Sequence, residues 1–222
     1  MKKKRLKTAS LNYELNLTAQ GYRIIAGIDE VGRGAWAGPV VAGAVCLPLE
    51  RTDLSIVLEG VRDSKQLSPR ARAALIERIQ HTAIAWGIGL SNHGEIDQLG
   101  IVPATCLAMQ RALEDTEQRA PHVQPEFLLL DSIRWRDLKQ PHLALVKGDQ
   151  LCLSIAAASV LAKVYRDNLM VELDSAYPDY GFAIHKGYGT PKHQAALKAH
   201  GTSPIHRMSY APMRVPADTP LW

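Results

Sequence analysis

Five short apolar runs stand out along the chain, and each has the length of a buried strand. They are bounded by glycine, proline or charged residues, which commonly flank strands. The runs lie at residues 23–29, 40–47, 83–90, 126–131 and 143–146. Because the first three follow one another, we expect them to form an antiparallel meander.

Segments between and after these runs predict helices. Ser68 before Pro69 places a capping residue ahead of a proline at the first helical position, so a helix should run from there to about residue 80. Other helices are expected at about 103–118, 151–176 and 190–201. This order of strands and helices predicts a mixed α/β fold.

The composition is that of an ordinary globular protein. Of the 222 residues, 46% are apolar and 22% are charged, which excludes an intrinsically disordered chain. No uncharged apolar stretch reaches the roughly 20 residues that cross a bilayer, and no apolar signal core follows the basic start. We therefore expect a cytoplasmic protein without membrane association. Cys46, Cys106 and Cys152 are far apart and form no CxxC pair, so buried, reduced thiols are expected rather than a zinc site.

Positive charge is concentrated at the two ends of the chain. Residues 1–7 carry five basic side chains and no acid, and subtracting these five charges from the net charge of +4 leaves −1 for residues 8–222. Basic ends around a neutral body suit a nucleic-acid ligand. We expect residues 1–20 to be a basic, flexible lead-in and residues 216–222 to be a tail. The lead-in can be interpreted as a solubilising segment or as an arm that attracts a polyanion.

Acidic residues at the ends of apolar runs are the candidates for chemistry. Asp29 and Glu30 end the first run, Asp131 ends the fourth, and Asp149 follows the fifth. If these strands are neighbours, four carboxylates meet at one edge, and such a cluster must be neutralised. All-oxygen ligands favour Mg²⁺ or Mn²⁺. Each acid taken singly can instead cap a helix or loop, and Asp167 is expected to pair with Lys163 four residues before it.

Two glycine-framed turns and one lysine are further candidates, each with two interpretations. Arg33 between Gly32 and Gly34 forms either a tight hairpin or a turn whose backbone approaches a ligand. Tyr188 either packs locally or stacks on a sugar or base. Lys65 is either solvated or touches a phosphate. The histidines of the last segment lack zinc-like spacing and are interpreted as structural or close to phosphate.

Taken in order, these motifs resemble those of bacterial ribonuclease HII, the type 2 ribonuclease H family. The opening motif covers residues 26–34 (AGIDEVGRG) and 37–42 (AGPVVA). The later matches are 63–67 (DSKQL), Asp131, 147–149 (KGD), 156–164 (AAASVLAKV) with Arg166 and Asp167, 187–190 (GYGT) and 203–207 (SPIHR). They extend over about residues 23–210, nearly the whole chain.

The resemblance implies a ribonuclease H-like fold, a mixed five-stranded sheet flanked by helices with a helical C-terminal extension. The catalytic domain would cover residues 21–215. The implied enzyme is a monomeric, metal-dependent endoribonuclease acting in DNA replication and ribonucleotide excision repair. It would hydrolyse the RNA strand of RNA–DNA hybrids and incise 5′ of single ribonucleotides in duplex DNA, leaving 3′-hydroxyl and 5′-phosphate ends.

The family's functional residues carry over to positions in this chain. The catalytic, metal-binding carboxylates would be Asp29, Glu30, Asp131 and Asp149, with two Mg²⁺ or Mn²⁺ ions when substrate is bound. The residues implied to contact nucleic acid are Gly32, Arg33 and Gly34 at the ribose 2′-hydroxyl, Tyr188 at the RNA–DNA junction, and Lys65 near a phosphate.

Two departures and two alternatives accompany this hypothesis. Ala35-Trp36 stands where many members have Pro-Leu, and Gly100 replaces a frequent Asn. Neither touches the carboxylates, so they bear on fine substrate preference. The alternatives are another metal nuclease with the same sheet, which would lack the two glycine turns, and a non-catalytic module that binds hybrids.

Overall fold

A computed structural model describes residues 8–214 and contains one five-stranded sheet. Its strands are β1 Ile25–Val31, β2 Val40–Cys46, β3 Ala85–Ser91, β4 Phe127–Asp131 and β5 His142–Leu145. The spatial order is β3-β2-β1-β4-β5, with β1, β2 and β3 antiparallel and with β4 parallel to both β1 and β5. The mixed sheet and its antiparallel meander confirm the expectation.

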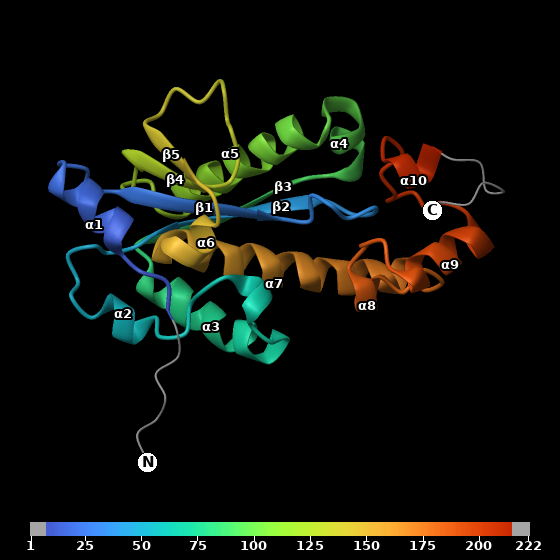
Figure 1. Cartoon of the computed structure of the whole chain (residues 1–222), viewed down its shortest axis with the longest axis horizontal. Helices are drawn as coiled ribbons and strands as arrows, with labels where there is room; N and C mark the ends of the chain where they lie inside the picture. The colour runs from blue at the N-terminus through green and yellow to red at the C-terminus, as the bar shows by residue number, and fades with distance from the viewer. Residues whose placement is uncertain (1–7, 215–222) are drawn as a thin grey trace, which may run out of the picture.

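Helices cover both faces of this sheet (Figure 1). One face packs on α5, and the other packs on α7, with α3 beyond it. The helices are α1 Asn12–Ala19, α2 Leu54–Val57, α3 Pro69–Thr82, α4 His93–Leu99, α5 Ile101–Arg119, α6 Gly148–Leu151, α7 Leu153–Ala176, α8 Phe182–His185, α9 Pro191–His200 and α10 Ala211–Arg214, with a 3-10 turn η1 at Ser64–Gln66. Within residues 8–214, no helix is both long and apolar enough to cross a membrane.

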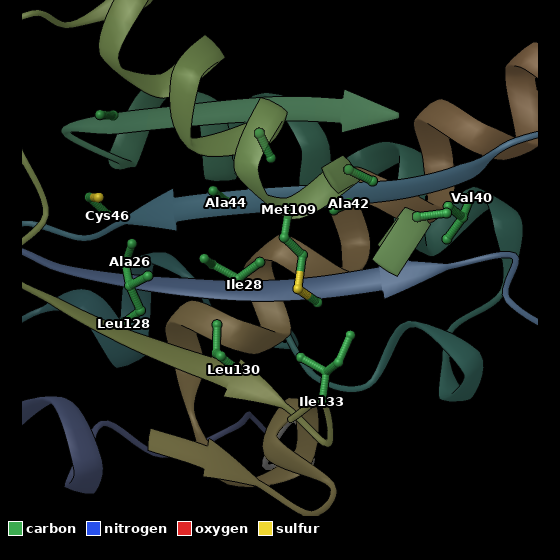
Figure 2. Packing of buried hydrophobic residues seen from close by; sticks show 14 of the residues in the cluster. Ala26, Ile28, Val40, Ala42, Ala44, Cys46, Met109, Leu128, Leu130 and Ile133 are labelled. Atoms are coloured by element: carbon green, nitrogen blue, oxygen red, sulfur yellow. The ribbon is translucent and has the colours of Figure 1, made fainter. Parts of the chain in front are cut away.

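Alternate residues of β1 separate the two halves of the core, as side chains of a strand point to opposite faces. Ile28 and Leu130 pack with Met109 of α5 in one cluster, as Figure 2 shows. Gly27 faces α7 instead, and a β-carbon there would lie 2.3 Å from the backbone nitrogen of Ile155. A glycine at this position therefore lets the start of α7 lie directly on the first half of β1.

The first described helix corrects the expectation of a flexible lead-in. Residues 12–19 form α1, and Glu14 on it is fully buried. Its carboxylate Oε1 accepts hydrogen bonds from the backbone N–H and the hydroxyl of Ser154, at 2.9 and 2.7 Å. This part of the expected lead-in is thus docked on the first turn of α7. Residues 1–7 and the predicted tail at 216–222 lie outside the described residues.

The C-terminal part is helical, as expected, and extends past one end of the sheet (Figure 1). Helix α7 continues beyond the strands, with α8 and α9 at its end, and α10 lies on the side of α4. Met170, Phe182, Ala196 and Ile205 form a separate small core there, which also includes Ala37 from the segment between β1 and β2. The segment that follows the first acids is therefore packed against the C-terminal extension.

Candidate metal and nucleic-acid site

Three aspartates meet where the central strands end. Asp29 lies near the end of β1, Asp131 is the last residue of β4, and Asp149 lies in the first turn of α6. Because β1 and β4 are parallel neighbours, their carboxyl ends share one edge of the sheet. One carboxylate oxygen from each aspartate lies within 4.8 Å of the others. This distance suits three oxygen ligands around one divalent cation.

Two residues in a left-handed backbone conformation fix Asp131. Ser132 and Lys147 have φ values of 47° and 58°, although neither is glycine. The turn at Lys147 directs the N–H of Gly148 to Asp131 Oδ1 at 2.7 Å, and the Ser132 hydroxyl reaches the same oxygen at 3.3 Å. Such strained conformations persist where the surrounding structure requires them, often at functional sites.

The aspartate cluster is electrostatically unfavourable without a cation. Burial, followed by the charge of Glu30, raises the pKa of Asp29 well above its usual value. Burial, followed by the charges of Asp131 and Asp63, raises the pKa of Asp149 to about 6. Although partial burial acts against it, the charges of Asp29 and Asp149 raise the pKa of Lys65. The negative charge of the cluster thus favours the protonated form of Lys65. One lysine neutralises only part of this charge, so the site can bind further cations.

Glu30 lies beside the three aspartates but outside their group. Its Oε1 accepts a hydrogen bond from Arg33 at 3.0 Å, while Oε2 is buried and has no hydrogen-bond partner among the described residues. Burial raises the pKa of Glu30, against the lowering effect of Arg33. A buried carboxylate oxygen without a partner is costly, so Oε2 is a further candidate ligand atom. The donors present therefore fit Mg²⁺ or Mn²⁺.

A fifth acid, Asp63, supports the site and was not among the predicted site residues. Its Oδ1 accepts the N–H of Lys65 at 2.9 Å, and its Oδ2 accepts the side-chain amide of Gln150 at 3.3 Å. Asp63 thereby caps η1 and joins it to α6, next to Asp149. An acid two residues before Lys65 in a loop is a sequence signal for such a cap.

The short turn η1 is also held by side chains of α7 and α3, and these contacts keep Lys65 beside the acids. The Ser159 hydroxyl of α7 donates to Ser64 Oγ at 2.9 Å. The buried Arg72 guanidinium donates to the carbonyls of Ser64 and Leu67 and contacts Asp167 at 3.4 Å. Asp167 also accepts from Lys163 at 2.7 Å, which confirms the expected pair.

The first glycine turn, residues 32–39, lies against the C-terminal extension. The buried Arg207 donates to the carbonyl oxygens of Arg33 at 2.9 Å and of Gly38 at 3.0 Å. The Tyr210 hydroxyl also donates to the Arg33 carbonyl. Gly34 at the tip is exposed, and no atom lies within 4 Å of the place its β-carbon would take. The backbone at the tip is therefore accessible to a sugar.

The second glycine turn, residues 186–190, is hydrogen-bonded to the first. The backbone N–H of Trp36 donates to the carbonyl of Gly187 at 2.8 Å. Tyr188 between the glycines is half-buried, so part of this residue is accessible to solvent. The two turns, about 150 residues apart in sequence, thus form one structural unit.

Three of the C-terminal histidines are buried behind this unit. Their rings stack and tilt against one another, and His193 Nε2 lies 2.9 Å from His206 Nε2. His193 Nδ1 lies 3.0 Å from the carbonyl oxygen of Tyr188, and His185 Nε2 lies 2.8 Å from that of Tyr180. Burial lowers the pKa of both His193 and His206 to about 4. These contacts support the structural interpretation of His185, His193 and His206.

Comparison with known proteins agrees with this arrangement. The family model described as Ribonuclease HII matches residues 26–213. A ribonuclease HII of Synechococcus sp. (strain JA-3-3Ab) is 53% identical over 205 residues, covering 92% of this chain and 89% of its own. A ribonuclease HII of Roseiflexus castenholzii is 52% identical over 200 residues, covering 90% and 87%. The crystal structure of ribonuclease H2 from Pyrococcus horikoshii has a TM-score of 0.70 at 25% identity, covering 86% of this chain and 95% of that one.

Proposed function

The chain belongs to the ribonuclease HII family, and from that premise we propose that it incises duplex DNA 5′ of single embedded ribonucleotides, as well as cleaving RNA–DNA hybrids. It is an endoribonuclease with metal-dependent ribonuclease H activity. The proposal that the enzyme cuts at single ribonucleotides rests on one observation. The chain combines the three-aspartate cluster with two glycine turns that are hydrogen-bonded to each other. A generic nuclease of this fold needs the acids alone.

The acids would hold the divalent cations of the reaction. We assign Asp29, Asp131 and Asp149 as direct ligands, with Glu30 contributing its unpartnered Oε2. Two Mg²⁺ or Mn²⁺ ions, when bound with substrate, would activate a water molecule and stabilise the leaving oxygen. No side chain is required as a covalent nucleophile. The water oxygen would bond to phosphorus and the bond from phosphorus to the 3′ oxygen would break, so the products would carry 3′-hydroxyl and 5′-phosphate ends.

The residues of the chain prepare the site for a polyanion. Arg33 holds one oxygen of Glu30 and leaves the other unpartnered. Gly148 and Ser132 hold Asp131 Oδ1 in place. Lys65, fixed by the cap at Asp63, offsets part of the negative charge that would repel a phosphate.

The two glycine turns would provide the selection for RNA. The tip at Gly32, Arg33 and Gly34 would bind the ribose 2′-hydroxyl, the group that separates RNA from DNA. Tyr188 would stack on the deoxyribose that follows the ribonucleotide. In support, Gly34 at the tip is exposed, and the Tyr188 turn is hydrogen-bonded to the first turn through Trp36.

Cleavage of three duplexes tests the proposal. The first carries one ribonucleotide, the second is a long RNA–DNA hybrid, and the third is DNA alone; each is incubated with Mg²⁺, Mn²⁺ or a chelator. We expect one cut 5′ of the single ribonucleotide, cuts throughout the hybrid RNA, none in the DNA, and none with chelator. Equal cleavage of the DNA duplex would favour the more general nuclease, and binding without any cleavage would favour the non-catalytic module.

Three expectations from the sequence accompany this proposal. We propose that the enzyme is a monomer in the cytoplasm and that residues 21–215 form its catalytic domain. Sedimentation of the purified chain tests the first of these statements.

A further inference from the structure

Arg166 is a buried cation that joins the two glycine turns. It lies on α7, and its side chain is fully buried. Its guanidinium donates to the carbonyls of Pro39 at 2.8 Å and Ala37 at 3.2 Å in the first turn. It also donates to the carbonyl of Lys186 at 2.9 Å in the second turn. One side chain therefore satisfies backbone acceptors from both turns.

The same guanidinium lies against the ring of Tyr188. Its central carbon is 5.5 Å from the centre of that ring, within the range of a cation–π contact. Arg166 thus contacts the second turn twice, through the Lys186 carbonyl and through the aromatic side chain proposed to meet the substrate. The aromatic contact restricts the direction in which the Tyr188 ring can point.

Gly32 makes room for Arg166. A β-carbon on Gly32 would lie 2.2 Å from Arg166 Nε, and the φ of 94° at this glycine is itself unfavourable for any other residue. The first glycine of the turn is therefore required by the arginine beneath it. The contact with Arg166 is therefore enough to explain why this position is a glycine, without any contact to substrate.

The burial of this charge is costly, which argues against a role in packing alone. Among residues 8–214, no carboxylate oxygen accepts a hydrogen bond from the Arg166 guanidinium. Burial lowers the pKa of Arg166 to about 10, so the group is still charged at neutral pH. An apolar residue could fill the same volume at lower cost, but it could not donate to three carbonyls.

We propose that Arg166 is a positioning residue that sets the place of Tyr188 relative to the Gly32–Gly34 tip and thereby the preference for an RNA–DNA junction. This inference rests on the proposed function, because it assumes that the two turns bind the ribonucleotide and the next sugar. Arg207 provides the comparison. It is equally buried and donates to carbonyls of the first turn, at Arg33 and Gly38, but it has no hydrogen bond to the second turn.

The kinetic test compares Arg166→Lys and Arg166→Gln with Arg207→Lys as the matched variant. We expect each Arg166 variant to lower kcat/KM about tenfold on a single embedded ribonucleotide and by threefold or less on a long hybrid. Arg207→Lys should lower both values by the same factor, because the tip of the first turn meets a ribose in both substrates. Equal losses on both substrates for the Arg166 variants would overturn the proposal.

A double-mutant cycle with Tyr188→Ala separates positioning from general destabilisation. If Arg166 acts through Tyr188, Arg166→Lys should have little further effect on the ratio of the two kcat/KM values once the ring is gone. Additive effects on that ratio would contradict the proposal. Equal loss on both substrates for Tyr188→Ala alone would instead contradict the proposed role of Tyr188 at the RNA–DNA junction. The hydrogen-exchange measurement would then decide whether Arg166 positions the two turns.

Amide hydrogen exchange tests the coupling without substrate. In Arg166→Lys, exchange at Trp36 and at Tyr188 should increase together by about fivefold or more, while β1 stays protected. In Arg207→Lys, exchange should increase in the first turn alone. An increase in one turn only for the Arg166 variant, or failure of both Arg166 variants to fold, would show a purely structural role and overturn the proposal.

Discussion

The indole ring of Trp36 lies so close to Gly189 that a β-carbon on residue 189 would be 2.1 Å from Trp36 Cζ2. Trp36 belongs to the departure from the family pattern noted in the sequence, and Gly189 closes the turn that carries Tyr188. The departure is therefore accommodated by direct contact with the second glycine turn. Its ring centre also lies 5.5 Å from that of His193, so the indole contacts the buried histidines as well.

Substitution of Gly189 by alanine should disturb this contact. Because Trp36 is nearly buried, the added methyl group has to displace the indole or the turn, at a cost of about 1–3 kcal/mol. We expect kcat/KM on a single embedded ribonucleotide to fall about tenfold or more. The double variant Trp36→Leu with Gly189→Ala should recover most of this loss, and a double variant no better than Gly189→Ala would show that the clash is not the cause.

Asp29→Asn and Asp131→Asn should each abolish cleavage and leave hybrid binding largely intact. Either change removes a negative ligand from the cluster, which weakens cation binding but also reduces the repulsion of phosphate. Steady-state cleavage and fluorescence anisotropy with labelled hybrid measure the two effects separately. Asp53→Asn is a suitable control, since Asp53 is paired with Arg51 away from the cluster. Cleavage within tenfold of wild type would contradict the assignment of that aspartate as a ligand.

The contribution of the aspartate cluster to the stability of the metal-free protein should fall as the pH rises from about 4 to about 6, whereas the lowered pKa values of His193 and His206 act in the opposite direction over this range. The raised pKa values of Asp29 and Asp149 mean that the folded state binds protons more tightly there than the unfolded state. Protonation therefore favours the folded state at low pH, and this contribution is lost as the pH rises through the folded pKa. Urea unfolding of wild type and of Asp149→Asn in chelator at several pH values isolates the aspartate contribution, because the histidines contribute equally to both proteins; the stability of wild type relative to the variant should fall as the pH rises.

Addition of Mg²⁺ should restore the stability that deprotonation removes. At pH 7.5, a concentration about ten times Kd should stabilise the protein by about 1.4 kcal/mol, and the effect should be smaller at pH 5, where protons compete with the cation. Thermal unfolding with and without Mg²⁺ at both pH values checks this expectation. An equal shift of Tm at the two pH values would indicate cation binding elsewhere.

Removal of the basic start should weaken hybrid binding mainly at low salt. Deleting residues 2–7 removes five positive charges and keeps Thr8, whose hydroxyl accepts the N–H of Gly60. Contacts between basic side chains and phosphates release counterions, so the salt dependence of Kd should become shallower. Turnover at saturating substrate should hardly change. A salt dependence unaltered by the deletion would favour the solubilising interpretation.

Tyr188→Ala should reduce the preference for a single embedded ribonucleotide. A stacking contact is worth roughly 1–3 kcal/mol, so kcat/KM should fall about ten- to hundredfold on that substrate. The loss should be smaller on a long hybrid, in which the next sugar is a ribose. Tyr188→Phe should retain most of the activity, and Tyr165→Ala, on an exposed part of α7, serves as the control. Equal losses on both substrates would favour local packing of Tyr188.

Local signals were sufficient to predict most elements of the fold. Ser68 caps α3 as expected, accepting the backbone N–H of Ala71, and Thr190 before Pro191 caps α9 in the same way, accepting the N–H of His193. The strand-end acids could be identified because a carboxylate at the end of a buried strand is costly unless it is paired, hydrogen-bonded or bound to a metal. Three of the four acids meet in the structure at the edge where the strand argument placed them.

The parts that were missed depend on contacts between distant residues. Glu14 is buried by Ser154, 140 positions away, and no local pattern marks such a partner. The residues next to Arg166 and Arg207 in the sequence do not indicate that these arginines are buried. Their side chains donate to carbonyl oxygens 127 and 169 positions away, respectively. Sequence periodicity describes which face of an element is apolar, and it contains no information about a buried charge whose acceptors belong to another segment.

Helix α7 fixes the distance and the relative orientation between the acids and the glycine turns. Ser159, which contacts Ser64 beside the acids, and Arg166, which holds the turns, are seven residues apart and so share one side of the helix. A single residue inserted between them would rotate Arg166 by about 100° and advance it by about 1.5 Å. If the acids and the turns act as proposed, the spacing between the cut site and the bound sugar would then be lost without any change in the residues assigned to either. Length variation during evolution should therefore be excluded from this stretch and tolerated in the exposed loop between β4 and β5.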